Sequence, residues 1–229
     1  MRDRSTTALI HELSSDLEAV RPIPRLREVV AGFAGLWLVN AAFAAWLRGP
    51  RPDLLTVFLH GPGYAAVMVG LLLVAAGGVV AGLAYAVPGR EQVWRSSLIV
   101  LALGTALGVV PGALLAIYDP MPGSHPCELG TDMRCLMFTI VRAVFPCVAL
   151  IAFLRRSNPE RPSLGLAAML IGSLAGAAVL SHLVCPESMP RHVTLTHAVG
   201  PVVVGAALAV PLALADRFGS SRLGRRFLR

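Results

Sequence analysis

The sequence predicts an all-α fold: a polytopic membrane protein with six transmembrane helices and a short amphipathic cytoplasmic helix at the N-terminus. Three observations support this prediction, namely long apolar stretches, short polar segments between them, and an uneven distribution of arginine. A helix needs about 20 apolar residues to cross the hydrocarbon core, and stretches of this length make up more than half of the 229 residues. The predicted spans are residues 29–47, 65–87, 98–118, 136–154, 164–184 and 193–215.

The arginines predict how the chain is oriented. The chain has 20 basic residues, all of them arginine, 13 acidic residues and a net charge of +7. With a cytoplasmic N-terminus, about 15 arginines lie inside and about four outside, which is the bias that short loops of membrane proteins show. Both termini are therefore expected in the cytoplasm. Because the arginines mark topology and contact anionic lipid, the net charge does not indicate direct binding of nucleic acid.

The apolar stretches leave room for one membrane domain and no separate soluble domain, because each remaining segment is shorter than a folded domain. We expect a cytoplasmic tail at residues 1–28, a six-helix transmembrane domain at residues 29–215 and a basic cytoplasmic tail at residues 216–229. Residues 1–28 carry charges throughout and lack the apolar segment of a signal peptide. The first span is therefore expected to be an uncleaved anchor.

The N-terminal tail contains a predicted amphipathic helix that starts at Thr6 or Thr7 and ends near Val20, before Pro22 and Pro24. Each proline lacks a backbone N–H and disfavours helix in the residue before it. On a helical projection, the apolar side chains fall within an arc of about 100°, the usual width of a buried stripe. This stripe comprises Leu9, Ile10, Leu13, Leu17 and Val20.

The polar flank of this helix is acidic, with Glu12, Asp16 and Glu18 beside the stripe. Helices that lie on membranes usually carry Lys and Arg on the polar face, so anionic lipid would repel this one. An apolar stripe with an acidic flank favours a groove in a protein partner. The alternative is that the stripe packs on the protein's own cytoplasmic loops, residues 88–97 and 155–163, which are short.

Small and charged residues within the spans predict where helices meet. Glycines four residues apart let helices approach closely, and they form three series: Gly78 and Gly82; Gly104, Gly108 and Gly112; Gly172 and Gly176. Arg142 is the one charge well inside a span. Ionisable groups within membranes are candidates for function, but a position two turns below the outer boundary also permits the side chain to snorkel to the interface. Both interpretations of Arg142 stay open.

The predicted outer loops gather sulfur and imidazole side chains. These are Cys127, Cys135, Cys185, His125, His182, His192, Met121, Met133 and Met189. Cys147 instead lies within the fourth span, where we expect it to act as a small apolar residue. Thiolate, thioether and imidazole ligands suit a soft metal ion such as copper(I), and also zinc. The candidate metal ligands are Cys127, Cys135, Cys185, His125 and His182.

Three interpretations of the outer thiols remain open from the residues alone. The first is a static disulfide between the two outer loops, which suits an oxidising compartment. The second is a switchable thiol pair or metal sensor that binds copper or zinc. The third is a set of inert thiols. The spacing is not CxxC, so neither a thioredoxin-like pair nor a zinc ribbon is indicated.

Four features in combination resemble a known family. They are the tail ALIHELSSDLEAVRP, the six spans, the Cys at the start of the fourth span in CLMFTIVRAVFPCVAL, and the CPES sequence after the fifth. Over nearly its whole length the chain resembles the NrsF-type membrane anti-sigma factors, the negative regulators of sigma F. The resemblance implies a protein of the bacterial inner membrane that performs no catalysis and holds an extracytoplasmic-function sigma factor at the membrane.

The resemblance also implies roles for particular residues. It makes Cys135 and Cys185 the sensing thiols, with Cys127 as an additional candidate. It also implies that the N-terminal segment contacts the sigma factor, through Leu9, Ile10, Leu13, Asp16 and Leu17. The chain departs from the usual pattern at Val184, where the family often has His directly before the second Cys. Cys127 is a second departure, and with these two departures the resemblance does not fix the stimulus.

Two other classes of protein remain as alternatives. A membrane thiol oxidoreductase or metal-handling protein needs two thiols close enough to exchange, with one pKa depressed, and the absence of CxxC counts against it. A small transporter usually needs more intramembrane charge than Arg142 provides. Both alternatives lack the specific match that the tail and the two cysteines give to an anti-sigma factor.

Overall fold

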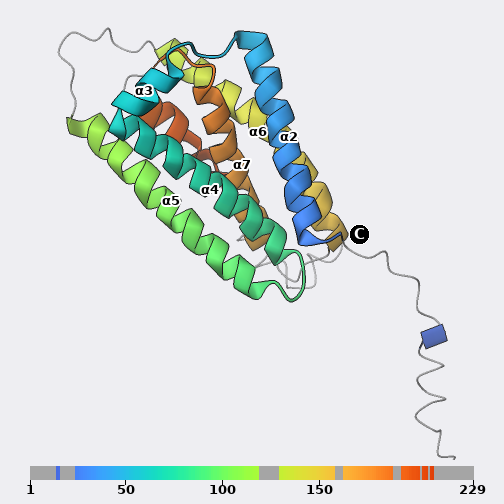
Figure 1. The fold of residues 1–229 in the computed structure, drawn as a ribbon. Coiled ribbons are helices and arrows are strands. Elements are labelled where there is room, and N and C mark those ends of the chain that lie inside the picture. Colours follow the sequence, from blue (N-terminus) through green and yellow to red (C-terminus); the bar gives the residue numbers. More distant parts are fainter. Residues whose placement is uncertain are drawn as a thin grey trace, which may run out of the picture.

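Long helices packed side by side make up the structure, and no strand occurs in the part of the chain that is described. The computed structural model describes residues 14–15, 24–118, 129–157, 162–187, 192–201, 203–205 and 207–208. Its elements are α2 (Leu26–Arg48), α3 (Leu54–His60), α4 (Pro62–Tyr85), α5 (Glu91–Tyr118), α6 (Leu129–Ser157), α7 (Pro162–His182) and the π-helical segment η1 (Val193–Val199). Figure 1 shows α2 and α4 to α7 running alongside one another. The all-α prediction is confirmed.

Four of these helices are long and apolar enough to cross a membrane. They are Leu26–Arg48, Pro62–Tyr85, Met133–Leu154 and Ser163–His182, and each coincides with one of the six predicted spans. A helix also forms over the third predicted span, as α5, and the described part of the sixth predicted span is helical and begins with η1. Among the described residues, only these four helices are both long enough and apolar enough to cross a membrane. Six crossings therefore stay a prediction.

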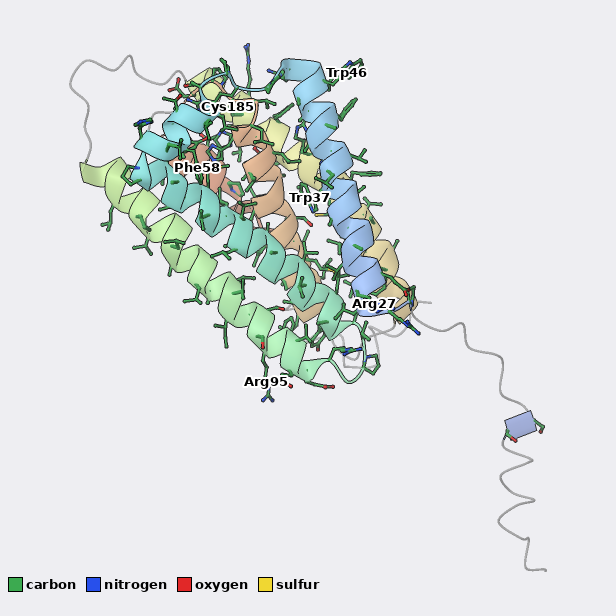
Figure 2. All side chains as sticks on the ribbon, in the orientation of Figure 1. Arg27, Trp37, Trp46, Phe58, Arg95 and Cys185 are labelled. Atoms are coloured by element: carbon green, nitrogen blue, oxygen red, sulfur yellow. The ribbon has the colours of Figure 1, made fainter. Side chains whose placement is uncertain are left out.

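The outward surface of the bundle is apolar, as lipid contact requires. Trp46 and Leu38 on α2 are 77% and 72% exposed, and Phe145 on α6 is 63% exposed. Figure 2 shows Trp46 pointing away from the other helices. Monomeric soluble proteins rarely expose large contiguous apolar patches, whereas lipid tails solvate them at no cost. The polar side chains buried inside the bundle are therefore the informative ones.

Glycines let α4 lie in close contact with α5 and α7. A Cβ atom on Gly78 would lie 2.6 Å from the carbonyl oxygen of Ala168 and 2.7 Å from the Cα of Gly172. A Cβ on Gly104 of α5 would lie 2.7 Å from the backbone nitrogen of Val74 on α4. Real Cβ atoms cannot approach backbone so closely, so glycine is required at these positions. The predicted glycine contacts are confirmed for the series on α4 and for Gly104 and Gly172.

The two ends of the bundle differ in chemistry. Figure 2 places Cys185 at one end, and Arg27 and Arg95 at the other. At the arginine end, the carboxylate of Glu28 accepts a hydrogen bond from the backbone N–H of Arg25 (3.3 Å), which satisfies a donor at the start of α2. This separation is what the predicted orientation requires. Which end faces the cytoplasm stays a prediction.

The N-terminal tail is described only in part. Ser14 and Ser15 are helical and exposed, and they fall within the predicted tail helix. The predicted partner-binding residues lie outside the described residues, and these are Leu9, Ile10, Leu13, Asp16 and Leu17. The same holds for the predicted C-terminal tail at residues 216–229. The tail enters the bundle at Leu26, the first residue of α2.

Candidate metal centre

Two cysteines and two histidines meet at the Cys185 end of the bundle. Cys135, Cys185, His192 and His197 each offer one ligand atom, and these atoms all lie within 4.8 Å of one another. Cys135 lies near the start of α6, Cys185 follows the end of α7, and the two histidines lie at the start of η1 and within it. We call these four residues the Cys/His cluster. It joins three segments that are separate in the sequence.

The measured distances link the four residues in a chain of contacts. The Sγ atoms of Cys135 and Cys185 lie 3.8 Å apart. The Sγ of Cys185 lies 3.5 Å from the Nε2 of His192, and that nitrogen lies 3.2 Å from the Nε2 of His197. Cys185 and both histidines are buried, whereas Cys135 is partly exposed.

The π-helical segment brings the two histidines together. His192 and His197 are five residues apart, which in an α-helix of 3.6 residues per turn would place them about 140° apart. A π-helix forms hydrogen bonds between residues i and i+5, and the backbone N–H of Gly200 donates to the carbonyl of Leu195 in this way. Residues five apart then lie on one face. The local widening of the helix therefore aligns both imidazoles toward the thiols.

The two thiols are close but not bonded. A disulfide has an S–S length of about 2.05 Å, and the 3.8 Å separation of Cys135 and Cys185 is well beyond it. Both residues are free cysteines here. Hydrogen bonds with Cys135, His192 and His197 lower the pKa of Cys185 well below its ordinary value, although burial acts in the opposite direction. An anionic sulfur beside imidazole nitrogen is a good ligand for a soft metal ion.

Arg51 fixes the segment that carries Cys185. Its guanidinium donates to the carbonyl oxygens of Cys185 (3.3 Å) and Glu187 (3.2 Å), and its backbone N–H donates to the carbonyl of Leu183 (2.8 Å). Asp53 accepts two hydrogen bonds from the same guanidinium, at 2.6 and 2.8 Å. The Arg51 guanidinium lowers the pKa of the Asp53 carboxyl. The pair therefore stays charged while it holds the loop after α7.

His182 lies beside the cluster rather than within it. Its ring centroid is 4.6 Å from that of His197, and its Nδ1 lies 3.4 Å from the hydroxyl of Tyr64. The side chain is completely buried. Of the predicted metal ligands, the structure brings Cys135 and Cys185 together and places His182 next to them. Cys127 and His125 lie outside the described residues.

Sequence reasoning did not select His192 and His197 as a pair of ligands. His192 belongs to the predicted outer loop, whereas His197 lies five residues later, within the sixth predicted span. The signal was the spacing of five residues, which places two side chains on one face only if the helix is π-helical. Nothing in the sequence alone marks the segment from Val193 to Val199 as π-helical.

Arg142 lies deeper in the bundle and connects α6 to α2. Its guanidinium donates to the backbone carbonyl and to the side-chain oxygen of Asn40, both at 3.1 Å, and the side-chain amide of Asn40 donates to the Arg142 carbonyl at 3.3 Å. The guanidinium carbon lies 4.1 Å from the centre of the Phe138 ring, a cation–π contact. Arg142 is only 7% exposed. It therefore makes an interhelical contact, and both interpretations of Arg142 stay predictions.

Helices of membrane-spanning length, with thiols and imidazoles buried at one end, define the class as a helical membrane protein with a candidate metal site. A family model described as "negative regulator of sigma F", NrsF, matches residues 13–215. The chain belongs to the NrsF family, and by that description it is a negative regulator of a sigma factor. No curated protein and no solved structure matches the chain.

Proposed function

We propose that this protein is a membrane anti-sigma factor that holds an extracytoplasmic-function sigma factor through its N-terminal segment. Release follows a chemical change at Cys135 and Cys185 at the opposite end of the bundle. The protein acts by binding, without catalysis. The family match supports the regulatory role, and the apolar stripe with its acidic flank supports the N-terminal segment as the contact.

One observation carries this proposal: the sulfur atoms of Cys135 and Cys185 lie 3.8 Å apart although the residues are 50 positions apart in the sequence. One thiol belongs to α6 and the other follows α7. Bridging the two sulfurs, by a disulfide or by a metal ion, would therefore change how α6 sits against the end of α7. Bridging two thiols within a single loop would not move one helix relative to another.

The contact between Arg142 and Asn40 offers a route from the thiols to the tail. Arg142 follows Cys135 by seven residues on the same helix, which is about 10 Å along its axis. Asn40 belongs to α2, whose first residue, Leu26, directly follows the tail. In α2 only 11% of the apolar span is buried against the rest of the protein. Phe33 and Trp37 of α2 also pack against the other helices, so the Arg142 contact is one of a few that hold α2 to the bundle.

The proposed protein has one state that holds the sigma factor and another that releases it. A signal shifts the equilibrium between them only if it binds the two states with different affinity. The reduced, ligand-free state is the one in which the tail is available to the sigma factor. Bridging Cys135 and Cys185 favours a second arrangement of α6, and the shift reaches α2 through Asn40. The tail is then withdrawn, and the sigma factor is free to bind RNA polymerase.

The test of the contact is capture of the sigma factor by purified protein in detergent. Deleting residues 1–20 should abolish capture, while the protein still inserts into the membrane and elutes as a single species. A finer variant replaces Leu9, Leu13 and Leu17 with alanine, and it should also lose capture. The matched control, Ser15→Ala, changes a residue off the apolar stripe and should capture as the wild type does. Capture that persists after the deletion would refute the tail as the binding segment.

A further inference from the structure

We propose that Cys135, Cys185, His192 and His197 form a four-coordinate site for a zinc-type ion. Their ligand atoms already lie within 4.8 Å of one another. The site itself stands on this geometry alone. Its role as the signal that releases the sigma factor rests on the proposed function.

The distances within the cluster match the edges of a tetrahedron around zinc. Zinc binds sulfur at about 2.3 Å and nitrogen at about 2.0–2.1 Å. With tetrahedral angles, these bond lengths place two sulfurs about 3.8 Å apart, sulfur and nitrogen about 3.5 Å apart, and two nitrogens about 3.3 Å apart. The observed separations are 3.8 Å for the two sulfurs, 3.5 Å from Cys185 to His192, and 3.2 Å between the imidazoles. Three edges of the tetrahedron are thus already formed.

The donor set selects the class of ion. Two thiolates with two imidazoles in a tetrahedron indicate zinc, whereas octahedral oxygen ligands suit magnesium and square-planar nitrogen and oxygen ligands suit copper(II). Two thiolates also balance the charge of a divalent ion. The filled site would therefore be neutral, which matters where Cys185, His192 and His197 are all buried.

Groups around the cluster hold the ligands in place. Arg51 binds the backbone carbonyl of Cys185, so the position of this thiol is set by the protein rather than by an ion. The ring of His182 packs against that of His197 at 4.6 Å and is itself held by Tyr64. Such outer partners fix the orientation of metal ligands. Among the described residues, the Nε2 of His182 has no hydrogen-bond partner, so a further imidazole nitrogen lies beside the site.

The three segments that carry the ligands give the ion a mechanical effect. An ion bound to all four residues would tie the start of α6 to the end of α7 and to η1. It would also shorten those separations, among ligand atoms that lie within 4.8 Å of one another, that exceed the edges of a zinc tetrahedron, which are about 3.3–3.8 Å. It would do so without oxidation of either cysteine, and its removal would reverse the change. Binding of the ion is thus the signal that we assign to the thiol pair.

The experiment measures zinc bound to full-length protein purified in detergent and dialysed against metal-free buffer. The wild type should retain about one ion per chain, the stoichiometry of a four-ligand structural site. Cys185→Ser and His197→Gln should each weaken binding by more than the 10–100-fold that loss of an outer partner costs. Matched controls are Cys147→Ser and His60→Gln, which change a cysteine and a histidine outside the cluster and should bind as the wild type does.

Cobalt(II) substitution gives a second readout that needs no variant. A tetrahedral site with two thiolates predicts intense visible absorption and a thiolate charge-transfer band. Weak absorption typical of octahedral cobalt would overturn the site, as would zinc binding that Cys147→Ser reduces as much as Cys185→Ser. Sigma capture is measured on the same samples. The same samples are also measured after a chelator has removed the ion. A wild type that binds no zinc but captures the sigma factor and releases it on oxidation refutes the metal site alone. A wild type that binds one ion but captures no sigma factor even after the chelator has removed that ion refutes the proposed function alone.

Discussion

At the scale of the residue, Arg142 shows what the sequence reveals and what it hides. The sequence identifies it as the one charge inside a span, and therefore as a candidate for function. Its partner, Asn40, lies 102 residues away and is the one amide in the apolar part of α2 between Glu28 and Arg48. No pattern in the sequence pairs the two, because the pairing depends on how α2 and α6 pack against each other. The same is true of the two thiols, whose proximity only the fold establishes.

Removing one side of this contact should destabilise the protein. Asn40→Leu removes the side-chain oxygen that the buried Arg142 guanidinium binds and leaves only the backbone carbonyl of residue 40. The loss of a partner by a buried polar group costs about 1–3 kcal/mol. The double variant Asn40→Leu/Arg142→Leu replaces both partners with apolar groups and should recover most of this loss. Thermal unfolding in detergent measures both effects as a double-mutant cycle. Equal destabilisation by the single and the double variant would contradict the pairing.

The same double variant tests whether the contact transmits the signal. Without the link between α6 and α2, the protein should still capture the sigma factor but should no longer release it when Cys135 and Cys185 are bridged. The measurement is sigma capture before and after the addition of zinc or oxidant. Release as in the wild type would show that the signal reaches the tail by another path.

At the scale of the element, the spacing of apolar residues and glycines predicts most of the helices. Apolar length alone located α2, α4, α5, α6 and α7, because a helix needs about 20 apolar residues to cross a bilayer. Two elements could not be found in this way. The short helix α3 (Leu54–His60) is too brief to give a periodic signal, and the π-helical conformation of η1 depends on packing rather than on composition. Both lie at the end of the bundle that carries the cluster.

Because α4 packs closely against α5 and α7, we expect replacement of its glycines to destabilise the protein. Gly78→Ala should destabilise the protein by about 1–3 kcal/mol, the usual cost of overpacking, because the new Cβ would lie 2.6 Å from the Ala168 carbonyl oxygen. The matched control is Gly32→Ala on α2, where nothing lies within 4 Å of the added Cβ. That variant should be neutral or slightly stabilising, since alanine favours helix. The measurement is the free energy of unfolding of both variants in the same detergent. Equal destabilisation by the two substitutions would contradict the close packing of α4 at Gly78.

At the scale of the whole molecule, the candidate sensing site and the arginine-rich end lie at opposite ends of the bundle. The Cys/His cluster lies at one end, and Arg27 and Arg95 lie at the other (Figure 2). A protein that reports across a membrane needs a sensing end and a responding end, joined by rigid elements. In the proposed mechanism α6 and α2 provide the connection, and α2 begins at the arginine end.

The orientation can be tested with single cysteines placed at the two ends, in a background where the four native cysteines are serine. Pro50→Cys lies at the cluster end and Arg95→Cys at the other, and both positions are exposed. In intact cells a membrane-impermeant maleimide should label Pro50→Cys and leave Arg95→Cys unlabelled until the cells are lysed. The reverse pattern would place the cluster in the cytoplasm, contrary to the positive-inside bias.

The most direct test of the central claim is sigma capture by the full-length protein with and without the signal. Wild-type protein from which a chelator has removed bound metal should co-purify with its sigma factor in reducing buffer and lose it when zinc or an oxidant is added. The double variant Cys135→Ser/Cys185→Ser should keep the sigma factor under every condition, whereas the control Cys147→Ser should release it as the wild type does. Release from the double variant, or capture by the wild type that no treatment changes, would contradict a thiol-gated anti-sigma factor.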